Sequence, residues 1–163
     1  MDFFRRADRR APAFEYTRLL VPMLGVPEVD DPALKVAALL LADRDQAEVA
    51  LLHVIEVPFE RNLDADDEAA VAAADAILSR GESVLAAAGI AARASTVQAR
   101  AAGPAIVDDA NELGTELIVM GLRYKKRFGG QWDAGRTVPY VMRNSTAPVW
   151  CLRAETKELA NTT

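Results

Sequence analysis

Apolar runs of strand length alternate with helical patterns along this chain of 163 residues, and this alternation restricts its fold most. The run "VALLHVI" at 49–55 is almost continuously apolar, which is typical of a strand buried on both faces of a parallel sheet. Shorter runs at 19–21, 116–121 and 147–153 predict three more strands. A fifth, "ARASTVQA" at 92–99, is the least apolar and is therefore expected at an edge of the sheet.

Four helical patterns lie between these runs, at 32–41, 66–88, 103–113 and 138–144. Asp31 before Pro32 is typical of an N-cap followed by the first helical residue. Gly89, directly after the longest helix, predicts a left-handed C-cap. The apolar stripe of that helix is expected at Val71, Leu78, Gly81, Leu85 and Ala88.

The resulting order of strands and helices predicts the fold class. Short connections and right-handed crossovers turn it into an α/β domain, a doubly wound five-stranded parallel sheet with helices on both faces. We expect this domain at 16–154, between an N-terminal leader at 1–15 and a C-terminal tail at 155–163. The leader places four arginines beside Phe3 and Phe4, which fits either a short amphipathic helix that touches a membrane or partner, or a loosely ordered end.

Composition and charge exclude several classes of protein. A content of 51% hydrophobic and 26% charged residues fits one globular domain with an adequate core. A net charge of -5 argues against nucleic-acid binding, which needs a broad basic surface. The single cysteine, Cys151, cannot form an internal disulfide and is expected to be a buried, inert thiol. The longest apolar run, 36–42, is far shorter than the roughly 20 residues of a membrane span, so we expect a cytoplasmic protein.

The stretch "GLRYKKRFGGQWDAGRT" at 121–137 is the candidate ligand loop. In an open parallel sheet, ligands bind beyond the carboxyl ends of the strands, where the winding direction reverses. If the first and fourth strands flank that reversal, the residues after Met23 and after Met120 face each other. The glycines of this stretch suit a phosphate-binding loop, while its cations, among them Arg123, also suit a solvated basic loop.

Over nearly all of 16–153, the chain resembles the universal stress protein family. The segments that carry the resemblance are "LLVPMLG", "AEVALLHVIEV", "AGPAIVDDANELGTELIVMG" and "GRTVPYVMRNSTAPVWCLR". The resemblance implies an adenine-nucleotide alpha-hydrolase-like sheet of order 3-2-1-4-5, a dimer, and ATP binding without conspicuous enzyme activity. The "GRTVPYV" ending is similar to members attached to or encoded with membrane transporters, which makes a transporter a candidate partner.

This chain departs from the glycine pattern of the family's ATP-binding members. Gly121 matches the first glycine, but Tyr124 replaces the second, and the loop to Gly135 is one residue longer. Arg136 stands where a hydroxyl residue would follow, with Thr137 one step later. Leu24 replaces an aspartate that lies near the adenosine in those members. Because tyrosine adopts positive φ only with strain and leucine accepts no hydrogen bond, the usual ATP pose is expected to be impaired.

The predicted pocket for a nucleotide or anion comprises Pro22, Leu24, Val54, Gly121, Arg123, Gly135, Arg136 and Thr137. The N–H groups at the helix start near Gly135, together with the cations at 123, 125, 126, 127 and 136, would attract an anion. No cofactor is assigned, and ATP or another phosphate-bearing anion is expected to bind only weakly.

Catalysis finds little support in these residues. His53, the only histidine, lies in an apolar run and is expected to be a core or strand-end residue rather than a base. The acids of "DADDEAAVAAAD" at 64–75 read better as a helix first turn than as magnesium ligands. We expect no enzyme.

Three functions stay open: a stress-response or signalling module that binds a ligand, a protein-interaction domain with an unused pocket that regulates a transporter, and a slow ATPase. A homodimer is expected through the last strand, whose apolar residues Val149, Trp150 and Leu152 would pair with their copies across a twofold axis.

Overall fold

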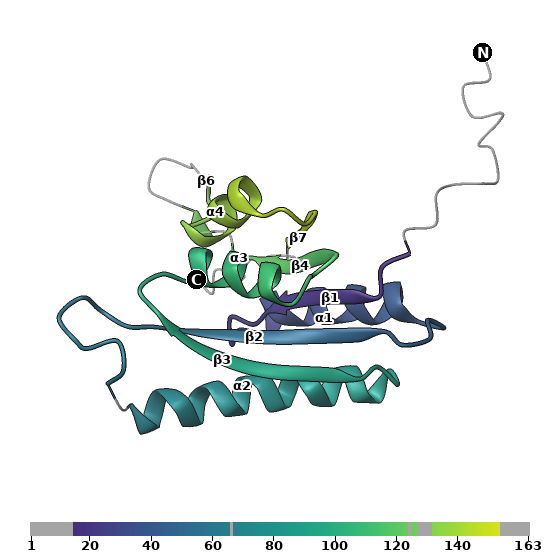
Figure 1. Cartoon of the computed structure of the whole chain (residues 1–163), viewed down its shortest axis with the longest axis horizontal. Helices are drawn as coiled ribbons and strands as arrows, with labels where there is room; N and C mark the ends of the chain where they lie inside the picture. The colour runs from purple at the N-terminus through teal and green to yellow at the C-terminus, as the bar shows by residue number, and fades with distance from the viewer. Residues whose placement is uncertain (1–14, 66, 124, 127–131, 154–163) are drawn as a thin grey trace, which may run out of the picture.

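The computed structural model describes residues 15–65, 67–123, 125–126 and 132–153. The strands of the main sheet alternate with the helices along them, as the sequence predicts (Figure 1). The elements are β1 (Arg18–Pro22), α1 (Pro27–Leu41), β2 (Glu48–Glu56), α2 (Glu68–Ala87), β3 (Ala92–Ala99), α3 (Ala102–Glu112), β4 (Leu117–Leu122), β5 (Lys125–Lys126), β6 (Trp132–Asp133), α4 (Thr137–Asn144) and β7 (Val149–Arg153).

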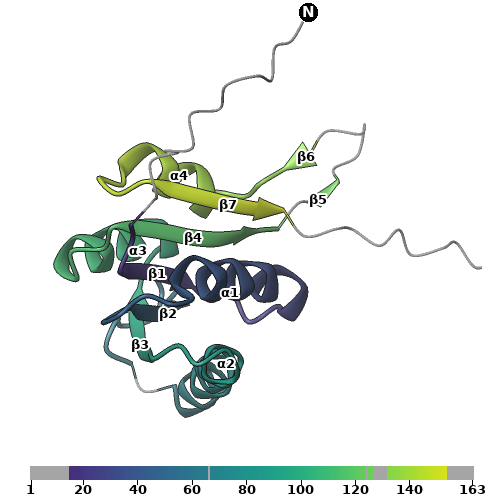
Figure 2. The same cartoon turned by 90° about the vertical axis from the view of Figure 1, so that its right-hand side faces the viewer.

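The main sheet has five strands in the order β3-β2-β1-β4-β7, and its neighbouring strands all run parallel. This order is the predicted 3-2-1-4-5, and the segment 92–99 forms an edge as expected. Helices α1 and α2 cover one face, while α3 and α4 cover the other (Figure 2). The short strands β5 and β6 form a separate antiparallel pair within the candidate ligand loop.

Two apolar layers share the central strands. Leu19 and Val21 pack against α1 and α2, whereas Leu20, between them, packs against α3 and α4. The same alternation in β4 sends Val119 to the first layer and Ile118 to the second. Because successive strand residues point to opposite faces, both layers need apolar side chains, which explains the nearly continuous apolar runs. Full burial of each such side chain contributes about 1.5–3 kcal/mol.

Helix α1 begins earlier than predicted. The sequence pattern placed the N-cap at Asp31 and the first helical residue at Pro32, but the N-cap is Val26 and the helix starts at Pro27. Pro32 lies inside the helix, at its sixth residue, where its missing N–H removes the bond that would otherwise be donated to the Glu28 carbonyl. The prediction was wrong because Pro27 and Pro32 both suit a first helical position, and the usual capping residue, Asp31, precedes the second of them.

Helix α2 agrees with its prediction at both ends to within two residues. Asp67 is the N-cap and accepts a hydrogen bond from the Ala70 N–H at 3.0 Å, and Gly89 has the left-handed φ of 74° expected after the helix. Its buried stripe is Ala74, Leu78, Gly81 and Leu85. Val71 and Ala88, which the sequence placed on this stripe, are exposed, so the buried face covers only the middle of the helix.

Cys151 is half-buried on β7 and packs against the α3–α4 layer. Burial raises the pKa of its thiol, which keeps it protonated and weakly reactive. Within the described ranges, each helix is too short or too polar to cross a lipid bilayer.

Glu116 ties the start of β1 to the start of β4. Its Oε2 accepts hydrogen bonds from the Thr17 N–H at 2.7 Å and the Arg18 N–H at 3.1 Å, and Oε1 accepts from the Arg18 guanidinium at 3.2 Å. The Thr17 hydroxyl donates a further bond. The central pair of strands is therefore fixed in register by one side chain as well as by its ladder.

We predict that Glu116→Ala lowers the free energy of unfolding by about 1–2 kcal/mol at pH 7, because several backbone and side-chain donors lose a charged acceptor. Hydrogen bonds from Thr17 and Arg18, the Thr17 N–H foremost, lower the pKa of Glu116 below its usual 4.5. This stabilisation is present above pH 4.5 and is lost as the pH falls through the lowered pKa. Urea unfolding at pH 7 and pH 3 measures it.

Glu15→Ala is the matched control, since it removes the same charge near the same strand end. An equal loss of stability in both variants, or a difference between wild type and Glu116→Ala that does not shrink in acid, would contradict this role of Glu116.

Candidate nucleotide and anion pocket

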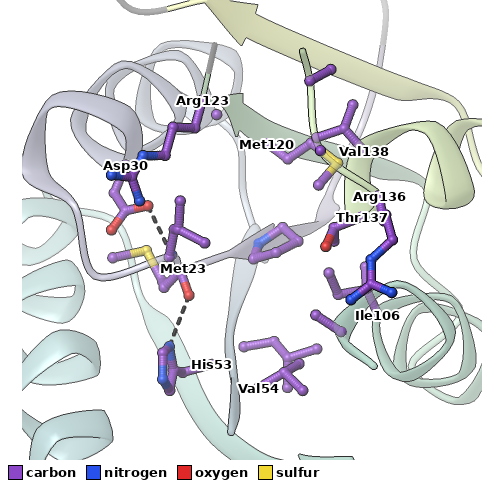
Figure 3. A pocket seen from close by; sticks show the side chains of 17 residues that line it. Met23, Asp30, His53, Val54, Ile106, Met120, Arg123, Arg136, Thr137 and Val138 are labelled. Carbon is purple, nitrogen blue, oxygen red and sulfur yellow. Dashed lines mark hydrogen bonds between the residues drawn. The ribbon is translucent and has the colours of Figure 1, made fainter. Parts of the chain in front are cut away.

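A cavity of about 360 Å³ opens at the carboxyl ends of β1 and β4, where the order of the strands reverses (Figure 3). All eight residues of the predicted pocket line it. They are Pro22, Leu24, Val54, Gly121, Arg123, Gly135, Arg136 and Thr137. The expected position of the site follows from the topology, because β1 pairs with β2 on one side and β4 on the other.

Much of the cavity wall is apolar. Met23 follows β1, Met120 lies near the end of β4, Ile106 comes from α3 and Val138 from α4. The sequence places Ile106 and Val138 only within helical patterns, at 103–113 and 138–144, and an apolar helix residue gives the same pattern whether it faces packed side chains or a cavity. Position at the carboxyl end of a strand or at the start of a helix was the signal that could have identified them.

Two cations stand at the cavity on opposite sides in the view of Figure 3. Arg123 directly follows β4, and Arg136 occupies the N-cap position of α4, where its side chain makes no capping hydrogen bond. Thr137 is the first residue of that helix and also lines the cavity. An anion in the cavity would therefore have a guanidinium at either side and the N–H groups of the α4 start beside it.

The rest of the basic segment is described only in part. Lys125 and Lys126 form β5 and pair with β6. Tyr124, in the place of the family's second glycine, and Arg127 lie outside the described residues. Their expected effects on a phosphate therefore stay predictions.

Asp30 is a pocket residue that the sequence analysis missed. It lies in the first turn of α1, is only 1% exposed, and its carboxylate accepts hydrogen bonds from the N–H groups of Leu24, Gly25 and Val26 at 2.9, 2.8 and 3.1 Å. Burial raises the pKa of Asp30, while the three loop N–H groups and Arg80 oppose that rise. An acidic residue in a helix first turn is so common that its sequence position carries no sign of this contact.

His53 also lines the cavity, and its ring orientation follows from one contact. Its Nδ1 lies 2.9 Å from the Met23 carbonyl oxygen. Because a carbonyl oxygen only accepts, Nδ1 carries a proton and donates it to this contact. His53, which lies within β2, thus supports the loop after β1 through the contact drawn in Figure 3.

Among the acidic residues at 64–75 that the structure describes, Asp67 has a local structural role. Asp67 caps α2 and pairs with Arg61 at 2.8 Å, which matches the interpretation of this segment as a charged helix start. The described side chains contain no group of three or more histidines, cysteines, aspartates or glutamates that could hold a metal ion.

Gly121 and Gly135 serve different physical needs. A Cβ added to Gly121 would lie 2.1 Å from the Val29 carbonyl oxygen, so the start of α1 can approach the end of β4 only over a glycine. Gly135 has a left-handed φ of 72° and no atom within 4 Å of an added Cβ. The first glycine of the family pattern is thus required here by packing, and the later one by backbone conformation.

We predict that Gly121→Ala destabilises the protein by about 3 kcal/mol, because the new methyl group overlaps the backbone of α1. Gly135→Ala is the matched control and is expected to cost about 1 kcal/mol, the strain of a left-handed alanine. Chemical unfolding of both variants measures the difference. Equal losses would show that Gly121 does not support this close approach.

The fold and site together define a class: doubly wound α/β domains with a cavity where the sheet order reverses. The family model described as the universal stress protein family matches residues 15–153. The chain belongs to the universal stress protein family.

Solved structures of the family share this fold. A universal stress protein from Archaeoglobus fulgidus is 23% identical, with a TM-score of 0.66, over 83% of this chain and 93% of that chain. A complex of the Archaeoglobus fulgidus universal stress protein with dAMP is 22% identical, with a TM-score of 0.61, over 83% of this chain and 97% of that chain. A family protein from Arabidopsis thaliana with AMP bound is 12% identical, with a TM-score of 0.63, over 90% and 97%. No curated protein matches the chain in sequence.

Proposed function

We propose that this chain is a regulatory module of the stress-response type that binds a small phosphate-bearing ligand, of which an adenosine monophosphate is the model, weakly and without turnover. One observation carries the proposal: the 360 Å³ cavity combines apolar walls with guanidinium groups at two sides. Apolar walls suit a nucleobase, and guanidinium groups suit a phosphate.

The chemistry of the walls favours a flat aromatic ring. Met23 and Met120 offer thioethers, which make favourable contacts with aromatic rings, and Ile106 and Val138 add aliphatic surface. The complexes of related proteins with dAMP and AMP support a ligand of this class.

Weak binding is proposed because the directed contacts of the ATP pattern are replaced by less directed ones. Leu24 offers no acceptor to a ribose, and its side chain is 51% exposed. Arg136 replaces a short hydroxyl by a long charged arm, which attracts phosphate with less geometric precision. With such contacts, the second and third phosphates of ATP would add little binding free energy to that of the first phosphate.

We predict that AMP binds with a Kd on the order of 0.1–1 mM, and that Arg136→Ala weakens it about tenfold, which is the loss of roughly one charge-assisted hydrogen bond. Affinity should fall steeply as salt rises from 0.05 to about 0.3 M, because exposed charges are screened. Isothermal calorimetry at two salt concentrations measures both effects.

Arg143→Ala is the control, since Arg143 lies in the last turn of the same helix and does not line the cavity. Tight, stoichiometric ATP binding would falsify the expectation that this pocket cannot hold ATP in the usual way. An absence of any AMP or phosphate binding at low salt would leave a solvated basic loop and an unused pocket.

The homodimer is a second part of this proposal. β7 is an edge of the sheet, and Val149, Trp150 and Leu152 on it are only half-buried although they pack against the two core layers. An apolar edge strand of this kind can pair with its own copy around a twofold axis. Association with a membrane transporter and a cytoplasmic location stay predictions from the sequence.

We expect Val149→Lys to shift the protein from dimer to monomer in sizing chromatography with light scattering, because a lysine would be buried at the paired edge. Thr96→Lys is the matched control on the opposite edge strand, β3. A wild-type monomer, or no shift with Val149→Lys, would rule out β7 as the interface.

A further inference from the structure

The loop after β1 closes around an anion that belongs to the protein itself. The N–H groups of three consecutive residues, Leu24, Gly25 and Val26, converge on the two carboxylate oxygens of Asp30 at 2.8–3.1 Å. Successive backbone N–H groups arranged in this way form a nest, a structure that binds anions such as phosphates. In this chain the nest is already occupied by a carboxylate that is 1% exposed.

Helix α2 holds the same loop from its other side. Arg80 Nη2 lies 3.6 Å from Asp30 Oδ2, and Arg80 Nη1 donates a hydrogen bond to the neighbouring Asp31. Gly25 has a φ of 82°, and a Cβ there would lie 2.6 Å from the Ile77 side chain. The loop is therefore clamped between α1 and α2, with the Asp30 carboxylate as the shared contact.

The clamped loop is also a wall of the cavity. Pro22, Met23 and Leu24 line it, and so does Asp30 (Figure 3). The loop N–H groups that could meet a ligand's phosphate already donate to Asp30, and the carboxylate would repel a second anion beside it. The cations Arg123 and Arg136 and the start of α4 are the remaining attractive groups of the cavity.

We propose that Asp30 is the positioning residue of this pocket: it holds the loop of residues 22–26 in its cavity-forming conformation and directs a ligand's phosphate to the Arg136 side. The part that concerns the phosphate rests on the proposed function, whereas the part that concerns the loop does not.

The matched variants are Asp30→Asn and Asp31→Asn. Both remove one charge near Arg80, but only the first removes an acceptor of the loop N–H groups, because an amide NH2 cannot accept.

The loop is tested by amide hydrogen exchange followed by NMR. In the wild type, the amides of Leu24, Gly25 and Val26 should exchange at least tenfold more slowly than exposed loop amides. In Asp30→Asn this protection should fall at least tenfold for one or more of the three, while Asp31→Asn keeps it. If these three amides exchange as fast as exposed loop amides in the wild type, Asp30 does not hold the loop. Full protection of all three amides in Asp30→Asn would overturn this role as well.

The phosphate is tested by titrating inorganic phosphate and AMP in the same samples. Phosphate should shift the amide signals of Thr137 and Val138 in the wild type and leave those of residues 24–26 in place. In Asp30→Ala, which vacates the nest, phosphate should shift the signals of residues 24–26 as well. AMP should bind Asp30→Asn about tenfold more weakly and Asp31→Asn as tightly as the wild type.

The outcomes separate the two proposals. If neither phosphate nor AMP binds the wild type, yet exchange depends on Asp30 as expected, the proposed function fails and the loop-positioning role stands. If phosphate shifts residues 24–26 of the wild type, or if AMP binds Asp30→Asn unchanged, the positioning role for the ligand is overturned. Melting temperatures recorded alongside separate a loss of affinity from a loss of fold.

Discussion

The burial of β1 and β4 on both faces is the constraint on which the rest of this structure depends. Leu20, Val21, Ile118 and Val119 have no exposed surface, so a layer of helices is needed on each side of the sheet. Winding the chain first to one side of β1 and then to the other satisfies this need, and it reverses the strand order between β1 and β4. The cavity is thus a by-product of how the two central strands are buried.

At that reversal, packing and ligand binding make different demands on the same residues. Gly121 matches the first position of a nucleotide-binding pattern, yet a Cβ at this position would already overlap the Val29 backbone of α1. Asp30 fills a backbone nest that could otherwise accept a phosphate. Residues of a family pattern can therefore be kept for structural reasons while the groups that bind the ligand change. In our proposal, the cations Arg123 and Arg136 are the groups that replace the usual phosphate contacts.

The fold was largely predictable because nearly continuous apolar runs and helical apolar patterns are properties of short segments of the sequence. The runs at 19–21, 49–55, 116–121 and 147–153 all became strands of the main sheet, and the polar run at 92–99 became its edge. The start of α1 was not predictable, since Pro27 and Pro32 give similar start signals and the choice between them depends on the loop. The predicted residues do line the cavity, because they lie at or near the carboxyl ends of β1, β2 and β4 or at the start of α4.

The sequence by itself determined the class of the fold and the edge of the sheet at which a site would form, because these follow from periodicity and spacing. The family was identified from the sequence as well, by the resemblance of several segments to those of known members. Tertiary structure alone decided what individual residues do there. Asp30 is an ordinary helix-start acid in the sequence, and only the fold brings the backbone N–H groups of residues 24–26 onto it. Met120 and Val138 belong to the buried core, and only the fold shows that they also line the cavity. Such roles depend on which distant atoms meet, and a local pattern holds no information about contacts made by folding back on the sheet.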